Sequence, residues 1–398
     1  MLIKRRSFIK GSGLATASLL MPRFLHAFGT EEKVPPGNKV LVVLQLSGGN
    51  DGLNTIIPYR NDIYYKSRPV IGIAKEKAIR LTDEAGMHPS LDYLGHLFQE
   101  GELGVLNNVG YPEPDRSHFR SMDIWHSASG SKAYWQTGWL GRLLDEQCKN
   151  CEHSTQAVEI DDMLSLALKG NNRNGFAFKD PRRLYQASRS PLLDDLLNAH
   201  DREHAEHTAS YLYKTLADTK KSTSYIFEQS RQVATGVYPS HEFGRNLKTV
   251  ASLILSDINT KVYYVSIGSF DTHVGQDVQQ TRLFKQINEG LKAFVEDLKK
   301  NNRFEDVLVM SFSEFGRRVA QNASKGTDHG TANNMFFISG GLKQQGILNE
   351  LDDLTSLRAG DLQYKIDFRR VYATVLERWL NVKAERILGA AFEPLGFI

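Results

Sequence analysis

The chain has 398 residues, of which 41% are hydrophobic and 24% are charged. This apolar fraction is enough for a buried core and excludes an intrinsically disordered protein. The 49 Lys and Arg residues against 46 Asp and Glu residues give a net charge of +3, which excludes a nucleic-acid binder that relies on phosphate neutralisation. The length fits two or three domains or one large α/β fold.

The first 27 residues resemble a twin-arginine export signal. The pair Arg5 and Arg6 is followed by an aromatic and a basic residue and then by a mild stretch of small, apolar residues. That stretch is shorter than the roughly 20 residues that a membrane span needs. We therefore expect a signal peptide at residues 1–27 that engages the twin-arginine translocase and is cleaved near Ala27, leaving a soluble periplasmic or extracellular product. The alternative is an amphipathic surface helix with a basic start.

Short aliphatic runs alternate with segments of helical periodicity along the rest of the chain. The runs are typical of strands buried on both faces, and the other segments repeat apolar residues at the helical spacing. The predicted strands are residues 40–46, 103–109, 262–267, 306–312 and 335–338, and the predicted helices are residues 90–99, 243–257, 282–298 and 368–380. This alternation predicts a parallel or mostly parallel sheet covered by helices on both faces. Ligands of such sheets bind beyond the carboxyl ends of the strands.

Residues 150–235 are polar and rich in charge, without a convincing buried strand, and we expect a helical insertion or cap there. Within it, His200, His204 and His207 would lie on one face of a helix over residues 192–217, a spacing that can bind a metal. Charged residues surround these histidines, however, and a solvated helix face explains the whole pattern.

Cys148 and Cys151 are the two cysteines of the chain, so one chain cannot form a four-thiolate zinc site. In an oxidising compartment they fit a local disulfide or two unpaired thiols on a loop. A redox protein that uses this pair is a minor alternative function.

Polar clusters follow the first two predicted strands. The first, residues 47–54, contains Asp51, a possible metal ligand, although Asn-Asp-Gly is also ordinary turn chemistry. In the second, Ser117 would lie in the first turn of a helix, where backbone N–H groups favour an alkoxide or an anionic ester. Arg116 beside it suits the oxygens of phosphate or sulfate, but a capped helix with surface arginines explains the same residues.

Two further clusters lie at the ends of the last three predicted strands. The third cluster, after residues 262–267, contains Asp271 and His273, which can converge on one metal ion, although such a pair is common. The fourth cluster combines two carboxylates, an arginine and an imidazole at sheet termini, a combination that packing alone does not explain. Its members are Glu314, Arg317, Asp328 and His329.

Together these motifs resemble a known family. The strings are Leu-Gln-Leu-Ser-Gly-Gly-Asn-Asp-Gly from residue 44, Arg-Ser-His-Phe from residue 116, Thr-Gly-Trp-Leu-Gly-Arg from residue 137, Phe-Asp-Thr-His from residue 270, Ser-Glu-Phe-Gly-Arg from residue 313 and Gly-Thr-Asp-His-Gly from residue 326. They are similar, over essentially the whole chain, to exported bacterial proteins catalogued as domain of unknown function fifteen-oh-one. That family is more distantly similar to the alkaline phosphatase and sulfatase superfamily. The resemblance implies one three-layer α/β/α domain over residues 38–398, with metal ions and a Ser or Thr nucleophile at the carboxyl edge of the sheet.

The resemblance also implies roles for individual residues. Ser117 resembles the nucleophile, His118 would assist the leaving oxygen, and Arg116 or Arg317 would orient the substrate. The residues that resemble metal ligands, for one or two divalent ions of zinc, calcium or manganese, are Asp51, Asp271, His273, Glu314, Asp328 and His329.

The chain departs from the superfamily pattern at three points. Asp51 lies several residues beyond the predicted strand, Asp271 and His273 are two residues apart instead of four, and Phe315 replaces an expected histidine. Each change would remove or relocate a ligand. A single metal ion, or none, is therefore compatible with the sequence.

The leading hypothesis is an exported, metal-dependent hydrolase of phosphate or sulfate esters with Ser117 as nucleophile. Its substrate would be a small-molecule or polysaccharide anionic ester. The competing hypothesis is a binding or assembly protein at the cell surface that has kept the sheet and lost catalysis, because Phe315 stands where a ligand is expected.

Overall fold

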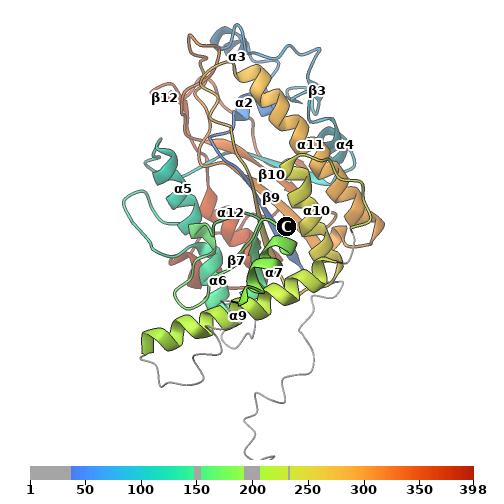
Figure 1. Ribbon diagram of the computed structural model, residues 1–398. Coiled ribbons are helices and arrows are strands. Elements are labelled where there is room, and N and C mark those ends of the chain that lie inside the picture. Colours follow the sequence, from blue (N-terminus) through green and yellow to red (C-terminus); the bar gives the residue numbers. More distant parts are fainter. Residues whose placement is uncertain (1–36, 148–153, 192–206, 232–233) are drawn as a thin grey trace, which may run out of the picture.

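The computed structural model describes residues 37–147, 154–191, 207–231 and 234–398. The predicted signal peptide, both cysteines and the first two of the three spaced histidines lie outside these residues. Within them, no helix has the length and apolar character needed to cross a bilayer. A nine-stranded sheet forms the centre of the described part (Figure 1), in the order β11-β5-β10-β9-β1-β8-β6-β7, with β14 paired to β5.

The strands of the central sheet are β1 (Val40–Leu46), β5 (Leu103–Gly110), β6 (Ala157–Glu159), β7 (Phe176–Ala177), β8 (Val262–Ile267), β9 (Val307–Phe312), β10 (Asn333–Ile338), β11 (Gly346–Ile347) and β14 (Ile366–Asp367). β1 pairs in parallel with β8 and β9, so that Val43 lies opposite Tyr264 and Met310. β10 runs antiparallel to both β5 and β9. The remaining pairs of this sheet are parallel, which confirms the mostly parallel sheet predicted from the sequence.

Smaller elements complete the chain. Two small sheets lie apart from the central one. The first contains β2 (Ile56–Ile57), β3 (Ile79–Arg80) and β4 (Gly86–Met87), and the second contains β12 (Leu357–Arg358) and β13 (Asp361–Leu362). The α-helices are α2 (Gly52–Thr55), α3 (Asp62–Ser67), α4 (Asp92–Gln99), α5 (His118–Ser127), α6 (Trp139–Gln147), α7 (Pro181–Ser188), α9 (His207–Ser230), α10 (Glu242–Leu255), α11 (Gln276–Lys300), α12 (Phe368–Thr374) and α13 (Ala384–Leu388). Short 3₁₀ turns lie at Ser154–Gln156, Leu166–Leu168 and Phe304–Asp306, and a π-helical turn lies at Val375–Trp379.

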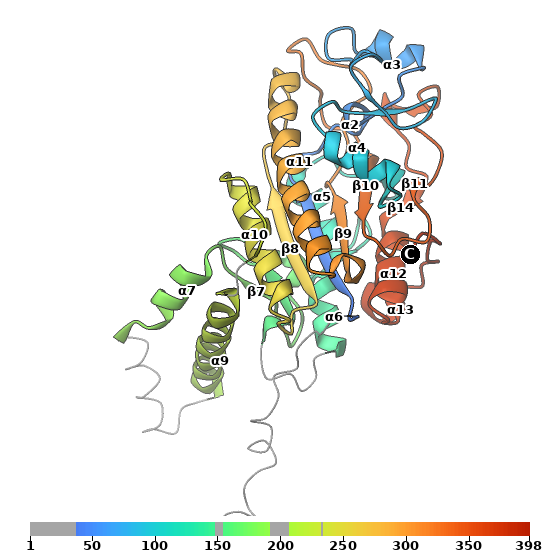
Figure 2. The same ribbon diagram turned by 90° about the vertical axis from the view of Figure 1, so that its right-hand side faces the viewer.

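Helices cover both faces of the sheet because the side chains of its central strands alternate between two apolar cores. In β1, Val42 and Leu44 pack in one core with residues of α4, α10 and α11, whereas Leu41 and Val43 pack in the other with residues of α5, α6, α12 and α13. Figure 2 shows β9 between α11 on one side and α12 and α13 on the other. The architecture is therefore a three-layer α/β/α sandwich.

Two segments differ from the sequence prediction. Residues 150–235 contribute β6 and β7 to the edge of the central sheet, where the sequence indicated only helices. Strands of three and two residues are too short to produce a recognisable apolar run. The predicted helix over residues 368–380 ends its α-helical part at Thr374 and continues as the π-helical turn.

The sheet topology brings distant loops to one edge. β1, β8 and β9 are parallel, so their carboxyl ends lie together. Because β10 is antiparallel to both of its neighbours, β5 runs in the same direction as β9, and the start of β10 lies at this edge too. The loops that follow β1, β5, β8 and β9, and the loop that precedes β10, therefore meet beyond one end of the sheet.

Candidate metal centre

Three imidazoles converge on the carboxylate of Asp271 at this edge. Asp271 and His273 follow β8, His118 begins α5, and His329 precedes β10. Asp271 Oδ1 lies 3.0 Å from His273 Nε2, 3.1 Å from His329 Nε2 and 3.5 Å from His118 Nε2. The Nε2 atoms of His273 and His329 are themselves 3.0 Å apart. The ligand atoms of His118, Asp271 and His329 all lie within 4.8 Å of one another, and His273 Nε2 adjoins Asp271 and His329 at the side of this group.

The outer nitrogen of each imidazole has an oxygen acceptor on the side away from Asp271. The pairs are His118 Nδ1 with Glu314 Oε1 at 2.8 Å, His273 Nδ1 with Asp328 Oδ1 at 3.2 Å and His329 Nδ1 with the Arg116 carbonyl oxygen at 2.8 Å. Ionised carboxylates and carbonyl oxygens only accept hydrogen bonds, so these partners assign the proton of each neutral ring to Nδ1. Each Nε2 then directs a lone pair toward the centre.

This arrangement fits a divalent cation. Lone pairs and a carboxylate oxygen that face one another at 3.0 to 3.5 Å repel each other unless positive charge lies among them. His118 Nε2 is buried and makes no hydrogen bond within the described part of the chain. Ligands about 2.0–2.1 Å from a tetrahedral zinc ion would be about 3.3 Å apart, close to the separations found here. His118, Asp271 and His329 offer ligand atoms that all lie within 4.8 Å of one another.

Hydrogen bonds and charges around the centre favour the ionised forms of Asp271 and Asp328. In the absence of a metal ion, when His329 Nε2 carries a proton, burial raises the pKa of Asp271, but hydrogen bonds from Arg317 and His329 outweigh this effect and lower that pKa to about 2. A hydrogen bond from Asn322, together with His273, lowers the pKa of Asp328. The hydrogen bond to Glu314 raises the pKa of His118, and burial partly opposes this rise.

Glu314 and Asp328 hold imidazoles and do not face the point where the Nε2 atoms meet. Glu314 is buried and also accepts a hydrogen bond from the Gly48 amide at 2.8 Å, so its position depends on the loop after β1. The sequence predicted both acids as metal ligands. The structure instead places each beside an Nδ1 atom, where it orients the ring and sets its tautomer.

The side chain of Arg317 forms hydrogen bonds with the loop after β1, the loop after β8 and the segment before β10. Its side chain is fully buried, and Nη2 lies 2.8 Å from Asp271 Oδ1. Its other hydrogen bonds go to the backbone carbonyl oxygens of Gly48, Gly49, Phe270 and Thr327. These bonds let the guanidinium position the loops around Asp271, and the contact between Arg317 and substrate stays a prediction.

Glycine is required where the loop after β1 passes beneath the centre. Gly48 has φ +117°, and a Cβ atom there would lie 2.5 Å from the backbone nitrogen of Asp271. Gly49 has φ +78°, and a Cβ atom there would collide with the Phe315 ring. Only glycine tolerates both the left-handed backbone and the close approach.

Asp51 lies away from the group formed by the imidazoles and Asp271. It is buried, and its Oδ2 atom accepts hydrogen bonds from Arg68 Nη1 at 2.5 Å and from Gln276 Nε2. Arg68 also donates to Asn54 Oδ1 at 2.8 Å. The structure thus does not bring Asp51 to the other predicted ligands, because a buried arginine is its counter-charge.

Ser117 and Arg116 lie directly before His118. Ser117 is the exposed N-cap residue of α5, and its hydroxyl forms no capping hydrogen bond. The guanidinium of Arg116 pairs with Asp361, while its carbonyl holds His329. Ser117 as nucleophile stays a prediction.

The sequence predicts that His118 assists the leaving oxygen, and the structure places its Nε2 atom 3.5 Å from Asp271 Oδ1. The ring of Phe315 lies against both His118 and His329, with centroid distances of 4.9 Å and 4.7 Å. The sequence signals for His118 are its place in the Arg-Ser-His-Phe motif and its position at the start of a helix beside the predicted nucleophile.

The fold and the donor atoms define an α/β/α protein with a candidate metal centre at the carboxyl edge of its sheet. The chain belongs to the family described as "Protein of unknown function (DUF1501)", whose sequence model matches residues 98–389. This match confirms the family predicted from the motifs. Among curated proteins, none matches the chain.

Solved structures show low similarity to this chain. The PsFucS1 sulfatase from Pseudoalteromonas sp. has a TM-score of 0.40 at 13% identity, covering 97% of this chain and 74% of that one. The lipoteichoic acid synthase LtaP from Listeria monocytogenes has a TM-score of 0.35 at 11% identity, covering 83% and 75%. A protein in the alkaline phosphatase superfamily from Vibrio parahaemolyticus has a TM-score of 0.31 at 13% identity, covering 79% and 63%. With TM-scores this low, the fold assignment depends on the observed sheet and its two cores.

Proposed function

We propose that this protein hydrolyses phosphate or sulfate esters with one divalent metal ion held by His118, Asp271, His273 and His329. The observation that carries the proposal is the convergence of His118, Asp271 and His329 within 4.8 Å of one another, with His273 Nε2 beside Asp271 and His329, while an acceptor holds every Nδ1 atom. Imidazoles that ligate metals in proteins have such outer partners. The nitrogen-rich donor set favours zinc, because calcium prefers oxygen ligands.

A divalent ion at this position would supply a Lewis acid that neutralises charge on an ester oxygen and lowers the pKa of a nearby hydroxyl. Ser117 lies at the start of α5, where free backbone N–H groups favour a negatively charged group. Its Oγ would bond to phosphorus or sulfur as the bond to the leaving oxygen breaks, and the hydroxyl proton would end on the leaving alcohol. Water would then cleave the serine ester, releasing phosphate or sulfate and restoring the hydroxyl.

The test uses the mature protein from residue 28 onward. We expect about one equivalent of bound zinc, and release of phosphate or sulfate from phenyl phosphate or phenyl sulfate. Ser117→Ala should abolish hydrolysis and keep the metal. The matched control is Ser131→Ala, which removes an exposed hydroxyl of the loop after α5 that donates to the Pro112 carbonyl.

Three results would count against this function. Hydrolysis that survives in Ser117→Ala would eliminate Ser117 as the nucleophile. Metal binding without hydrolysis of any anionic ester would favour a binding protein. Absence of both bound metal and hydrolysis would reject the metal centre as well.

We also propose that the protein acts outside the cytoplasm after twin-arginine export. The support is the pair Arg5 and Arg6 ahead of a short apolar stretch. Cell fractionation should find the wild-type protein outside the cytoplasm and the double variant Arg5→Lys, Arg6→Lys inside it. Equal distribution of the two proteins would reject this route.

A further inference from the structure

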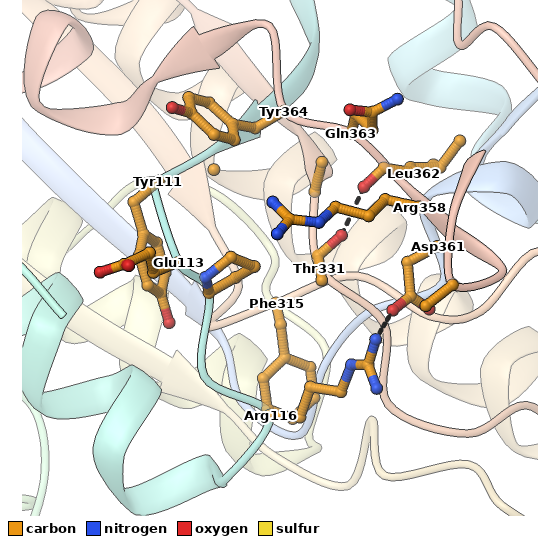
Figure 3. Close-up of a pocket in the computed structure, with 14 residues that line it drawn as sticks. Tyr111, Glu113, Arg116, Phe315, Thr331, Arg358, Asp361, Leu362, Gln363 and Tyr364 are labelled. Atoms are coloured by element: carbon orange, nitrogen blue, oxygen red, sulfur yellow. Dashed lines mark hydrogen bonds and ion pairs between the residues drawn. The ribbon is translucent and has the colours of Figure 1, made fainter. Parts of the chain in front are cut away.

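A cavity of about 440 Å³ opens beside the metal centre. It lies between the loop from β5 to α5, the segment before β10 and the hairpin formed by β12 and β13 (Figure 3). Tyr111, Phe315, Leu362 and Tyr364 contribute aromatic and apolar walls. Such walls suit the carbon frame of a ring-shaped ligand.

Phe315 separates this cavity from the imidazoles. The same ring that lines the cavity lies against His118 and His329, at centroid distances of 4.9 Å and 4.7 Å. Arg116 links the two places as well, since its side chain lines the cavity and its carbonyl oxygen accepts the His329 hydrogen bond. The cavity and the imidazoles therefore share the Phe315 ring as a common wall.

The acidic groups of the cavity are already neutralised. Asp361 is buried and is shared by Arg116 and by Arg318, whose Nε atom lies 3.2 Å from its Oδ1 atom. Glu113 pairs with Lys132 at 3.0 Å. These carboxylates leave no negative charge free to compensate a further cation.

Arg358 supplies that further cation. Its exposed side chain points into the space between Tyr111 and Thr331 (Figure 3). No side chain of the described ranges forms an ion pair or hydrogen bond with its guanidinium, whereas Arg116 and Arg318 are both paired with Asp361. The cavity thus carries uncompensated positive charge on a group that suits bidentate contact with an oxyanion.

We propose that this cavity binds a second anionic group of the substrate, with Arg358 as the residue that determines specificity. The substrate class is a ring-shaped ester that carries, besides the phosphate or sulfate to be removed, a carboxylate, sulfate or phosphate on the ring. The ring would lie against Phe315 and the tyrosines, and the second anionic group would lie at Arg358. The link to ester cleavage rests on the proposed function, whereas the anion site itself does not.

The kinetic test compares phenyl phosphate with 4-carboxyphenyl phosphate, and the corresponding sulfates, using the mature metal-loaded protein. Arg358→Gln should lower kcat/KM for the carboxylated ester about tenfold, the loss expected for one charge-assisted contact, and leave the plain ester unchanged. Arg386→Gln is the matched control, because Arg386 is an exposed arginine of α13 that pairs with Glu146 and does not line the cavity. Equal loss for both esters in Arg358→Gln would overturn the proposal.

A binding test separates this proposal from the proposed function. Ligand-detected NMR should show benzoate, but not neutral benzamide, binding to the wild-type protein with or without EDTA, and binding should be lost in Arg358→Gln and kept in Arg386→Gln. This result in a protein without hydrolytic activity would reject the proposed function and keep the anion site. Benzoate binding that persists in Arg358→Gln, or no binding to the wild-type protein, would reject the anion site whatever the activity.

Discussion

Glu314 accepts a hydrogen bond from His118 Nδ1 at 2.8 Å, and its buried carboxylate also accepts the Gly48 amide at 2.8 Å. The carboxylate therefore connects the first residue of α5 to the loop after β1. It holds the His118 ring in the orientation that directs Nε2 toward Asp271. This relationship makes the metal centre depend on a residue that does not face it.

Glu314→Gln should weaken metal binding by about 10- to 100-fold, because a neutral amide makes His118 a less basic ligand while its oxygen still accepts the hydrogen bond. Titration with a competing chelator measures the affinity. Asp328→Asn is the matched control and should cost less, since Asp328 has a 54% exposed side chain and water can replace it. An unchanged affinity in Glu314→Gln would mean that His118 is not a ligand.

Asp51→Asn should destabilise the protein without removing its metal. The Arg68 side chain has no exposed surface, and Asp51 is the acid with which it forms an ion pair. Removing the charge of one partner of a buried pair costs about 3 kcal/mol or more of unfolding free energy. Denaturation by urea measures the loss, and metal analysis of the folded variant should give the wild-type stoichiometry. A variant as stable as wild type that has lost its metal would restore Asp51 as a ligand.

Arg317→Lys should lower the unfolding free energy by about 3 kcal/mol, because lysine keeps the charge but cannot reach the five acceptors of the buried guanidinium. Metal affinity should fall with stability, since Asp271 loses its hydrogen bond. The neighbouring Arg318→Lys serves as control and should cost less than about 1 kcal/mol, because the Arg318 side chain is 37% exposed. Equal stability of the two variants in guanidinium chloride denaturation would contradict the positioning role.

The sequence predicts the elements that form the sheet edge better than the contacts made there. Aliphatic runs predict β1 and β8 with their observed bounds, and their parallel pairing brings Asp271 and His273 to the expected edge. Periodicity also predicts α4, α10 and most of α11. The predicted helix begins at residue 282, whereas α11 begins at Gln276. Gln276 is polar but buried, and it donates a hydrogen bond to Asp51, so the apolar spacing of a helix is not visible at this end.

The roles of the acids could not be predicted because a carboxylate after a strand has the same sequence pattern whether it faces a metal, an imidazole or an arginine. Asp51, Glu314 and Asp271 all follow strand ends. They differ in their partners, which are Arg68, His118 Nδ1 and three Nε2 atoms respectively. Those partners come from loops that only the tertiary fold brings together.

The last prediction concerns Glu159, which ends β6 in a buried position and accepts a hydrogen bond from the Ser165 amide at 2.7 Å. Burial raises the pKa of Glu159 from 4.5 to about 7, although the hydrogen bonds from Ser165 oppose this rise. The folded state therefore holds a proton that the unfolded state releases between these two pH values. The contribution of the protonated Glu159 to the unfolding free energy is complete below pH 4.5 and is lost as the pH rises through about 7.

Glu159→Gln mimics the protonated side chain and should remove this dependence. Its unfolding free energy should match that of wild type near pH 4.5 and exceed it by about 3 kcal/mol at pH 8, since 1.36 kcal/mol per pKa unit over about 2.5 units gives this order of magnitude. Urea denaturation at the two pH values measures the difference. The control variant Asp162→Asn, at an exposed position nearby, should change the unfolding free energy by less than about 0.5 kcal/mol at both pH values. A Glu159→Gln variant that is less stable than wild type at pH 8 would show that the buried carboxylate is ionised and that a positive group stabilises it.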